Sequence, residues 1–179
     1  MVFIINEYER KNMFGSGERI GREVNDLVER WIPTAVHDHE HGYQSELQAY
    51  LDEKLNDRSG GFGLGIGGEK HVVGTERGIS RGDVVVDGVV GIELECDFSG
   101  SRKEKLRGQL EDYAADYDFV IAVACGIEDV EGWRELENEF GRSRRGTTDM
   151  TEFNFVIKRG EDMGKEPRTG GLFGGGGLL

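Results

Sequence analysis

The sequence is poor in cysteine, proline and aromatic residues, and it has no long apolar run. Only 2 of its 179 residues are Cys, 2 are Pro and 9% are aromatic. Two cysteines cannot build a disulfide scaffold, and no apolar run approaches the roughly 20 residues that cross a bilayer. A charged stretch from Glu7 follows the short apolar start, so we expect no secretory signal. These absences predict one compact cytoplasmic domain with no membrane partner.

Positive charge is also scarce. Asp and Glu total 35 against 22 Lys and Arg, which gives a formal net charge of −13. Such a surface normally repels nucleic acid and anionic membranes. It is also typical of proteins from very salty cytoplasm, where screening over a few Å weakens the repulsion. The charge therefore excludes no partner class by itself, and it raises the expectation of a halophilic source, archaeal or viral.

Hydrophobic periodicity predicts an α/β domain with a central mixed sheet flanked by helices. Apolar residues recur at helical spacing in four stretches: residues 17–31, 44–55, 101–117 and 130–140. Short β-branched or apolar runs predict five strands: residues 71–80, 82–88, 89–96, 118–125 and 153–158. We expect residues 1–159 to form the domain and residues 160–179 to be a Gly-rich disordered tail.

Four carboxylates are candidates for a shared site. Asp83 begins the second predicted strand, and Glu93 and Glu95 lie two apart on the third, so both point to one face. Glu46 lies on the preceding helix. Carboxylates crowded on apolar strands are costly unless a cation lies between them, and Mg²⁺ or Mn²⁺ prefers oxygen ligands. The alternative is that the two glutamates mark the solvated face of a half-buried strand.

The helix predicted over residues 101–117 adds three polar side chains. Lys105, Gln109 and Tyr113 are spaced i, i+4 and i+8, so they share one face of the helix. An ordinary amphipathic helix, with Tyr113 in the core and Lys105 at the rim, has the same spacing.

These segments together resemble a known family. In order, GDVVVDG, GIELE, KEKLRGQLEDYA and DFVIAVACG resemble the PD-(D/E)xK nuclease superfamily, especially its RecB-like and restriction-endonuclease-like branches. The resemblance covers residues 44–126 and implies a restriction-endonuclease-like core of helix, three strands, helix and strand. It also implies that the protein is a metal-dependent deoxyribonuclease, with Mg²⁺ or Mn²⁺ as cofactor and DNA as substrate.

The resemblance assigns roles to single residues. Asp83 and Glu93 correspond to the metal ligands, and Glu46 to the acidic residue of the first core helix, which supports the metal directly or through water. Gln109 and Tyr113 correspond to the QxxxY pair, near the metal or the nucleic acid.

One position departs from the family pattern, because Glu95 stands where the family usually has lysine. Glu95 itself could orient the attacking water, as glutamate does in some restriction endonucleases. Lys105 could have taken over the role from the following helix, where Lys103 is less suited because it lies off the Gln109/Tyr113 face. We favour Lys105, because a further carboxylate repels the phosphate. The third reading is an inactive fold that only binds nucleic acid or a protein.

Other features keep further readings open. An acidic structural or adaptor protein of a virus or plasmid is the alternative from another class, and a homodimer is also compatible with the sequence. Three histidines alternate with acidic residues before the helix at 44–55, and they suit a transition metal or a polar linker: His37, His39 and His41. The densest basic cluster could contact phosphates or offset nearby acid: Arg142, Arg144 and Arg145.

Overall fold

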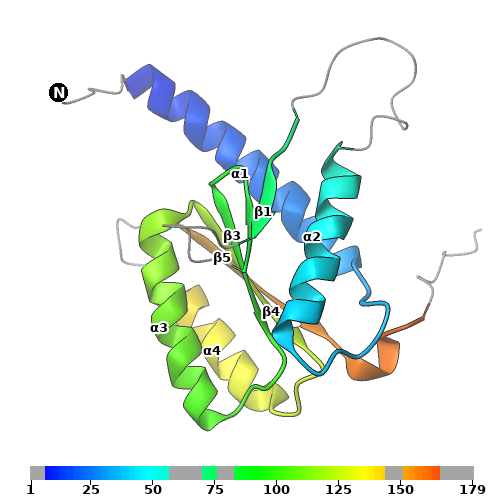
Figure 1. Ribbon diagram of the computed structural model, residues 1–179. Coiled ribbons are helices and arrows are strands. Elements are labelled where there is room, and N and C mark those ends of the chain that lie inside the picture. The colour runs from blue at the N-terminus through cyan, green and yellow to red at the C-terminus, as the bar shows by residue number, and fades with distance from the viewer. Residues whose placement is uncertain (1–6, 57–69, 76–82, 144–150, 166–179) are drawn as a thin grey trace, which may run out of the picture.

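The computed structural model describes residues 7–56, 70–75, 83–143 and 151–165. These residues form a five-stranded mixed sheet flanked by four α-helices, so the predicted α/β class is confirmed (Figure 1). The elements are α1 (Glu7–Arg30), α2 (Glu40–Asn56), β1 (Val73–Thr75), β2 (Val84–Val86), β3 (Val90–Glu95), α3 (Gly100–Asp116), β4 (Phe119–Cys125), α4 (Val130–Ser143), β5 (Glu152–Lys158) and a short 3₁₀ helix, η1 (Gly160–Asp162). None of the helices in this part of the chain is long and apolar enough to cross a membrane.

The strands lie side by side in sequence order. β1, β2 and β3 are antiparallel neighbours, and Asp87 and Gly88 make the turn between β2 and β3 with positive φ angles of 53° and 70°. β3 and β4 are parallel through α3, and β4 and β5 are parallel through α4. From α2 to β4 the order is helix, three strands, helix and strand, as predicted for residues 44–126.

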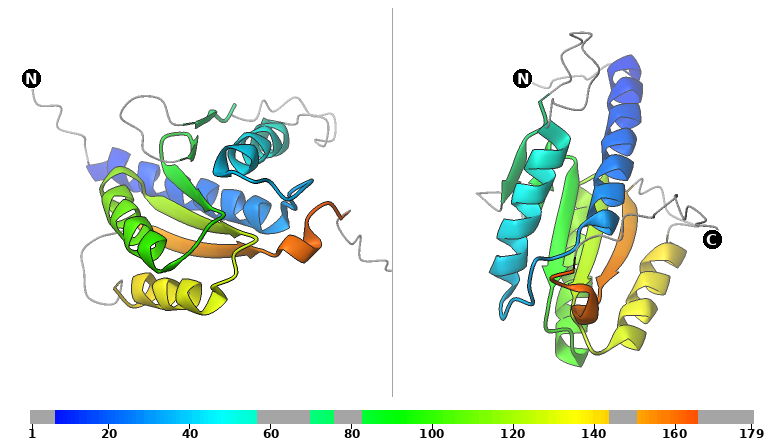
Figure 2. Two further views of the ribbon diagram at one scale, coloured as in Figure 1. Left: turned by 60° about the horizontal axis from the view of Figure 1, so that its bottom comes forward. Right: turned by 90° about the vertical axis from the view of Figure 1, so that its right-hand side faces the viewer.

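The sheet separates two apolar clusters. One cluster packs α1 and α2 against one face of the sheet, and the other packs α3 and α4 against the opposite face (Figure 2). The alternation of side chains along a strand decides which residue joins which cluster. On β4, Ile121 and Val123 face α1 and α2, whereas Ala122 and Ala124 face α3 and α4.

The two ends of the domain differ from the prediction. α1 begins at Glu7, ten residues before the predicted start, and its first turns are rich in good helix formers such as Glu, Arg and Lys. The predicted tail begins at residue 160, but residues 160–162 form η1 and residues 163–165 follow it as a turn. Gly164 donates its N–H to the Pro33 carbonyl at 2.8 Å, and Met163 packs against the α1/α2 cluster. That apolar contact explains why the order extends past the last strand.

Some predicted features fall outside the described part of the chain. These are the rest of the predicted tail, residues 166–179, the second half of the first predicted strand, residues 76–80, and the side chains of the basic cluster: Arg142, Arg144 and Arg145.

Candidate active site

β3 presents two buried glutamates to α3. Val90, Ile92 and Leu94 point into the α1/α2 cluster, so Glu93 and Glu95 point to the other face. Their exposed fractions are only 8% and 4%. Their partners on β4 are the alanines at 122 and 124, whose small side chains leave room for the carboxylates beneath α3.

Glu93 is held by two donors from α3. Gln109 Nε2 donates to Glu93 Oε1 at 2.6 Å, and the Tyr113 hydroxyl donates to Glu93 Oε2 at 2.6 Å. The donors lie one helical turn apart, so a single face of α3 reaches both carboxylate oxygens. The orientation of Glu93 is therefore set before any ligand arrives.

Asp83 lies beside Glu93 at the start of β2. The antiparallel register pairs Val84 with Ile92, so continuing it by one residue places Asp83 opposite Glu93. The Leu94 N–H donates to Asp83 Oδ2 at 2.8 Å. On the other side, Gln44 Nε2 donates to the Asp83 carbonyl at 2.7 Å. The Asp83 carboxylate is thus tied to the backbone of β3.

The crowding of these acids raises their pKa values. Burial raises the pKa of Glu93 to about 8, Asp83 and the neighbouring acids add to the rise, and the Tyr113 hydrogen bond opposes it. Burial and the nearby carboxylate of Glu40 raise the pKa of Glu95 to about 7, and Arg102 opposes that rise. Neighbouring carboxylates repel one another here, which is the electrostatic setting that a cation relieves.

Arg102 is the cation that reaches this cluster. Its Nη1 lies 2.9 Å from Glu40 Oε1 and 3.2 Å from Glu95 Oε1, and its Nη2 lies 3.6 Å from Asp97 Oδ2. Both Arg102 and Glu40 were missed in the sequence. The sequence does carry a signal for Arg102, which lies seven residues before Gln109. Seven residues are about two helical turns, so the two side chains leave nearly the same face of α3. Glu40 was missed because α2 begins four residues before the predicted start.

Glu46 makes its contacts elsewhere. Its carboxylate accepts bonds from the Thr34 N–H at 2.7 Å and the Thr34 hydroxyl at 3.0 Å, and it lies 2.9 Å from His37 Nε2. These bonds organise the loop between α1 and α2. Six residues correspond to about 240° of rotation on a helix, so Glu40 and Glu46 point in different directions. Asp83, Glu40 and Glu95 are the carboxylates that raise the pKa of Glu93 in addition to burial.

The two lysines of α3 are placed differently. Lys103 Nζ lies 2.6 Å from Glu135 Oε2 on α4. Lys105 is exposed, and it forms no ion pair with any other residue that the structure describes. It lies one turn before Gln109 on the same side of the helix. The structure therefore leaves Lys105 near the rim of the site, without contact to Glu93.

The histidines serve the α1–α2 loop and the start of α2. His37 bonds to Glu46 and packs edge-on against Tyr43, and His41 Nδ1 lies 3.0 Å from Gln44 Oε1. Among the described residues, no group of three or more His, Cys, Asp or Glu side chains is arranged to hold a metal ion. Mg²⁺ is usually bound through one or two carboxylates, with waters and substrate phosphates completing the shell. Asp83 and Glu93 are a donor set of that kind.

Comparisons with protein-family models, with curated proteins and with solved structures found no significant match. The chemistry of this site therefore has to be inferred from its own residues.

Proposed function

We propose that the protein is a metal-dependent nuclease that hydrolyses DNA phosphodiester bonds, with a restriction-endonuclease-like core. The observation that carries this proposal is the placement of Asp83 opposite Glu93, with Glu93 held by Gln109 and Tyr113. The nuclease resemblance requires three features together. These are two neighbouring carboxylates, two donors that orient one of them, and the matching order of helices and strands.

The donor set suits a hard divalent cation. Asp83 and Glu93 would hold Mg²⁺ or Mn²⁺ through oxygen atoms, and the substrate phosphate would supply further ligands. When bound, such an ion polarises the phosphoryl oxygen, lowers the pKa of water and stabilises the charge on the leaving oxygen. The α2 carboxylate of Glu40 adds to the negative charge that acts on Glu93, whereas Glu46 bonds to Thr34 and His37.

The remaining residues orient and exchange protons. Gln109 and Tyr113 keep both oxygens of Glu93 in place. A water that attacks phosphorus must lose a proton, and Glu95 can accept it because its pKa is raised to about 7. Arg102 bonds to the same carboxyl at 3.2 Å, which fixes its position and offsets its charge. Lys105 is the other candidate for orienting the water, from the rim of the site.

A binding-only module is the second candidate function. The position of the usual lysine holds Glu95, and Arg102 is already engaged by Glu40, Glu95 and Asp97. Because these carboxylates already engage the Arg102 guanidinium, it is not available to a phosphate. This favours a protein that has lost catalysis. Such a protein would bind DNA or a protein partner without cutting.

The test is a nuclease assay on single-stranded, duplex and branched DNA, with Mg²⁺, Mn²⁺ or EDTA and with KCl varied. We expect cleavage that needs the metal. Asp83→Asn and Glu93→Gln should each lower the rate at least about 100-fold, because each removes a ligand of the ion that stabilises the transition state. Glu111→Gln is the matched control, since Glu111 is an exposed carboxylate on α3. Binding of DNA without cleavage in either metal would replace the nuclease with the binding module.

Two further variants separate the candidates for the missing lysine. If Glu95 accepts the proton, Glu95→Gln should abolish cleavage, while Lys105→Ala should change little beyond substrate affinity. If Lys105 has the role, the pattern reverses, and Glu95→Lys should restore activity to the Lys105→Ala variant. Full activity in both single variants would show that neither residue acts on the water.

A further inference from the structure

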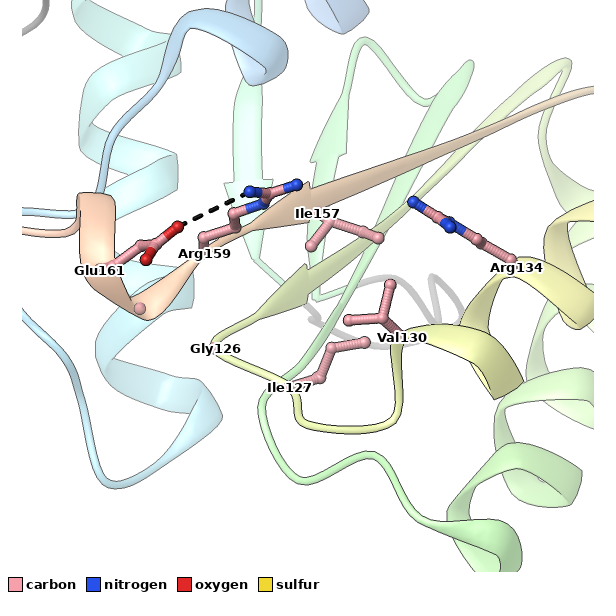
Figure 3. A pocket seen from close by; sticks show the side chains of 8 residues that line it. Gly126, Ile127, Val130, Arg134, Ile157, Arg159 and Glu161 are labelled. Atoms are coloured by element: carbon pink, nitrogen blue, oxygen red, sulfur yellow. Dashed lines mark ion pairs between the residues drawn. The ribbon is translucent and has the colours of Figure 1, made fainter.

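A second polar feature lies at the carboxyl ends of β4 and β5. A cavity of about 470 Å³ opens there. Its apolar floor is formed by Ile127, Val130 and Ile157. Arg134 reaches toward the floor from α4, and Arg159 lies on its other side at the end of β5 (Figure 3). Two guanidinium groups thus flank a short apolar surface.

The charges of this cavity are weakly compensated in a chain of net charge −13. Arg134 forms no ion pair with the other residues that the structure describes. Arg159 meets Glu161 at 3.6 Å, with both side chains about 70% exposed, and exposed pairs of this kind contribute little. Arg159 also borders a second cavity of about 450 Å³, whose charged lining is mixed and includes Lys165, Glu29 and Asp162. The excess of positive charge is therefore confined to the first cavity, where Arg134 and Arg159 face one carboxylate, that of Glu161.

The cavity lies on the same face and at the same end of the sheet as the candidate active site. In the parallel register Glu95 is level with Ala124, and Ala124 is level with Ile157. Neighbouring strands are about 4.8 Å apart, so β3 and β5 are separated by roughly 10 Å. Ligands of open α/β sheets bind outside the carboxyl ends of the strands. A chain of phosphates that crosses this end would meet both places.

We propose that the cavity between α4 and the end of β5 binds backbone phosphates of the DNA strand, through Arg134 and Arg159. This inference rests on the proposed function for the identity of the ligand. Guanidinium groups match phosphate oxygens in paired hydrogen bonds. The apolar floor between them suits the sugar that joins two successive phosphates. Contacts of this kind position the strand and carry no sequence information.

The test is binding of a short fluorescein-labelled single-stranded oligonucleotide, followed by fluorescence anisotropy in EDTA over a range of KCl concentrations. The double variant Arg134→Gln/Arg159→Gln should bind about tenfold more weakly. The slope of log affinity against log salt should fall by about 1.4, because each lost contact to a single strand contributes about 0.7. Arg22→Gln is the control, since Arg22 is exposed and ion-paired on α1, across the sheet. Thermal melting checks that each variant is folded.

The outcomes separate this inference from the nuclease proposal. If the double variant keeps its affinity and salt slope while the wild type cleaves DNA normally, the phosphate-binding role of the cavity is wrong and the nuclease proposal stands. If the double variant binds more weakly but the wild type never cleaves DNA, the phosphate-binding role of the cavity stands and the nuclease proposal is wrong. A wild type that binds no DNA at low salt would reject both.

Discussion

The two faces of β3 are both buried, and they are chemically opposite. Ile92 and Leu94 lie in the α1/α2 cluster with almost no exposed surface. Glu93 and Glu95, on the α3 side, are 8% and 4% exposed. The first face stabilises the fold through apolar area removed from water. The second face costs stability, because buried carboxylates lose hydration and repel one another. A buried polar face of this kind is what the proposed site requires.

The surroundings of the two faces differ for the same reason. Apolar residues of α1 and α2 need only fill space around Ile92. Around the glutamates, α3 supplies a specific donor for each oxygen of Glu93 and a guanidinium for Glu95. The polar face is thus compensated group by group, and each group can be removed separately.

The largest expected effect comes from the apolar face. Ile92→Ala should lower the free energy of unfolding by about 2–5 kcal/mol, through lost burial and the cavity that remains. Urea denaturation measures the change. Glu93→Gln is the matched substitution one residue away, and it should cost far less. Equal losses in the two variants would contradict the division between a stabilising apolar face and a polar face that costs stability.

The pH dependence of stability should come from the polar face. The pKa of Glu93 is raised to about 8 in the folded protein, from an ordinary value near 4.5. Between these values the folded state binds more protons than the unfolded state, so stability falls as pH rises. In EDTA, stability should decrease by on the order of 2–3 kcal/mol from pH 5 to pH 8.

The Glu93→Gln variant should lose the part of this slope that comes from Glu93, because it has no proton to release there, and should keep the part that comes from Glu95, whose pKa is raised to about 7. Thermal or urea unfolding at several pH values gives the measurement, and Glu111→Gln should keep the slope of the wild type. A wild-type stability that rises across this range would mean that Glu93 is ionised and compensated in the folded state.

A smaller effect should come from the glycine on the polar face. Gly91 precedes Glu93 by two residues, and a methyl group there would overlap the ring of Tyr117. Gly91→Ala should therefore destabilise the protein by about 1–3 kcal/mol. Gly108→Ala is the control on α3, where a methyl group meets no atom within 4 Å, and it should stabilise the helix by about 0.5–1 kcal/mol. A neutral Gly91→Ala would show that α3 moves easily away from β3.

Local patterns in the sequence were enough to predict much of the fold and the placement of Asp83 opposite Glu93. The order of helices and strands from α2 to β4 follows from hydrophobic periodicity, which depends only on neighbouring residues. The pairing of Asp83 with Glu93 follows from a hairpin with an Asp-Gly turn. The shared face of Gln109 and Tyr113 follows from helical spacing.

Tertiary packing decided the features that depend on distant segments. The contact of Glu40 with Arg102, and the contact of Glu46 with Thr34 and His37, depend on where α2 begins and how it lies over the sheet. The engagement of Arg102 joins α2, β3 and α3. The cavity between Arg134 and Arg159 exists only because α4 returns the chain to a parallel strand beside β4. Periodicity assigns each side chain to a face of its own element, whereas the partner across that face is set by how the elements pack together.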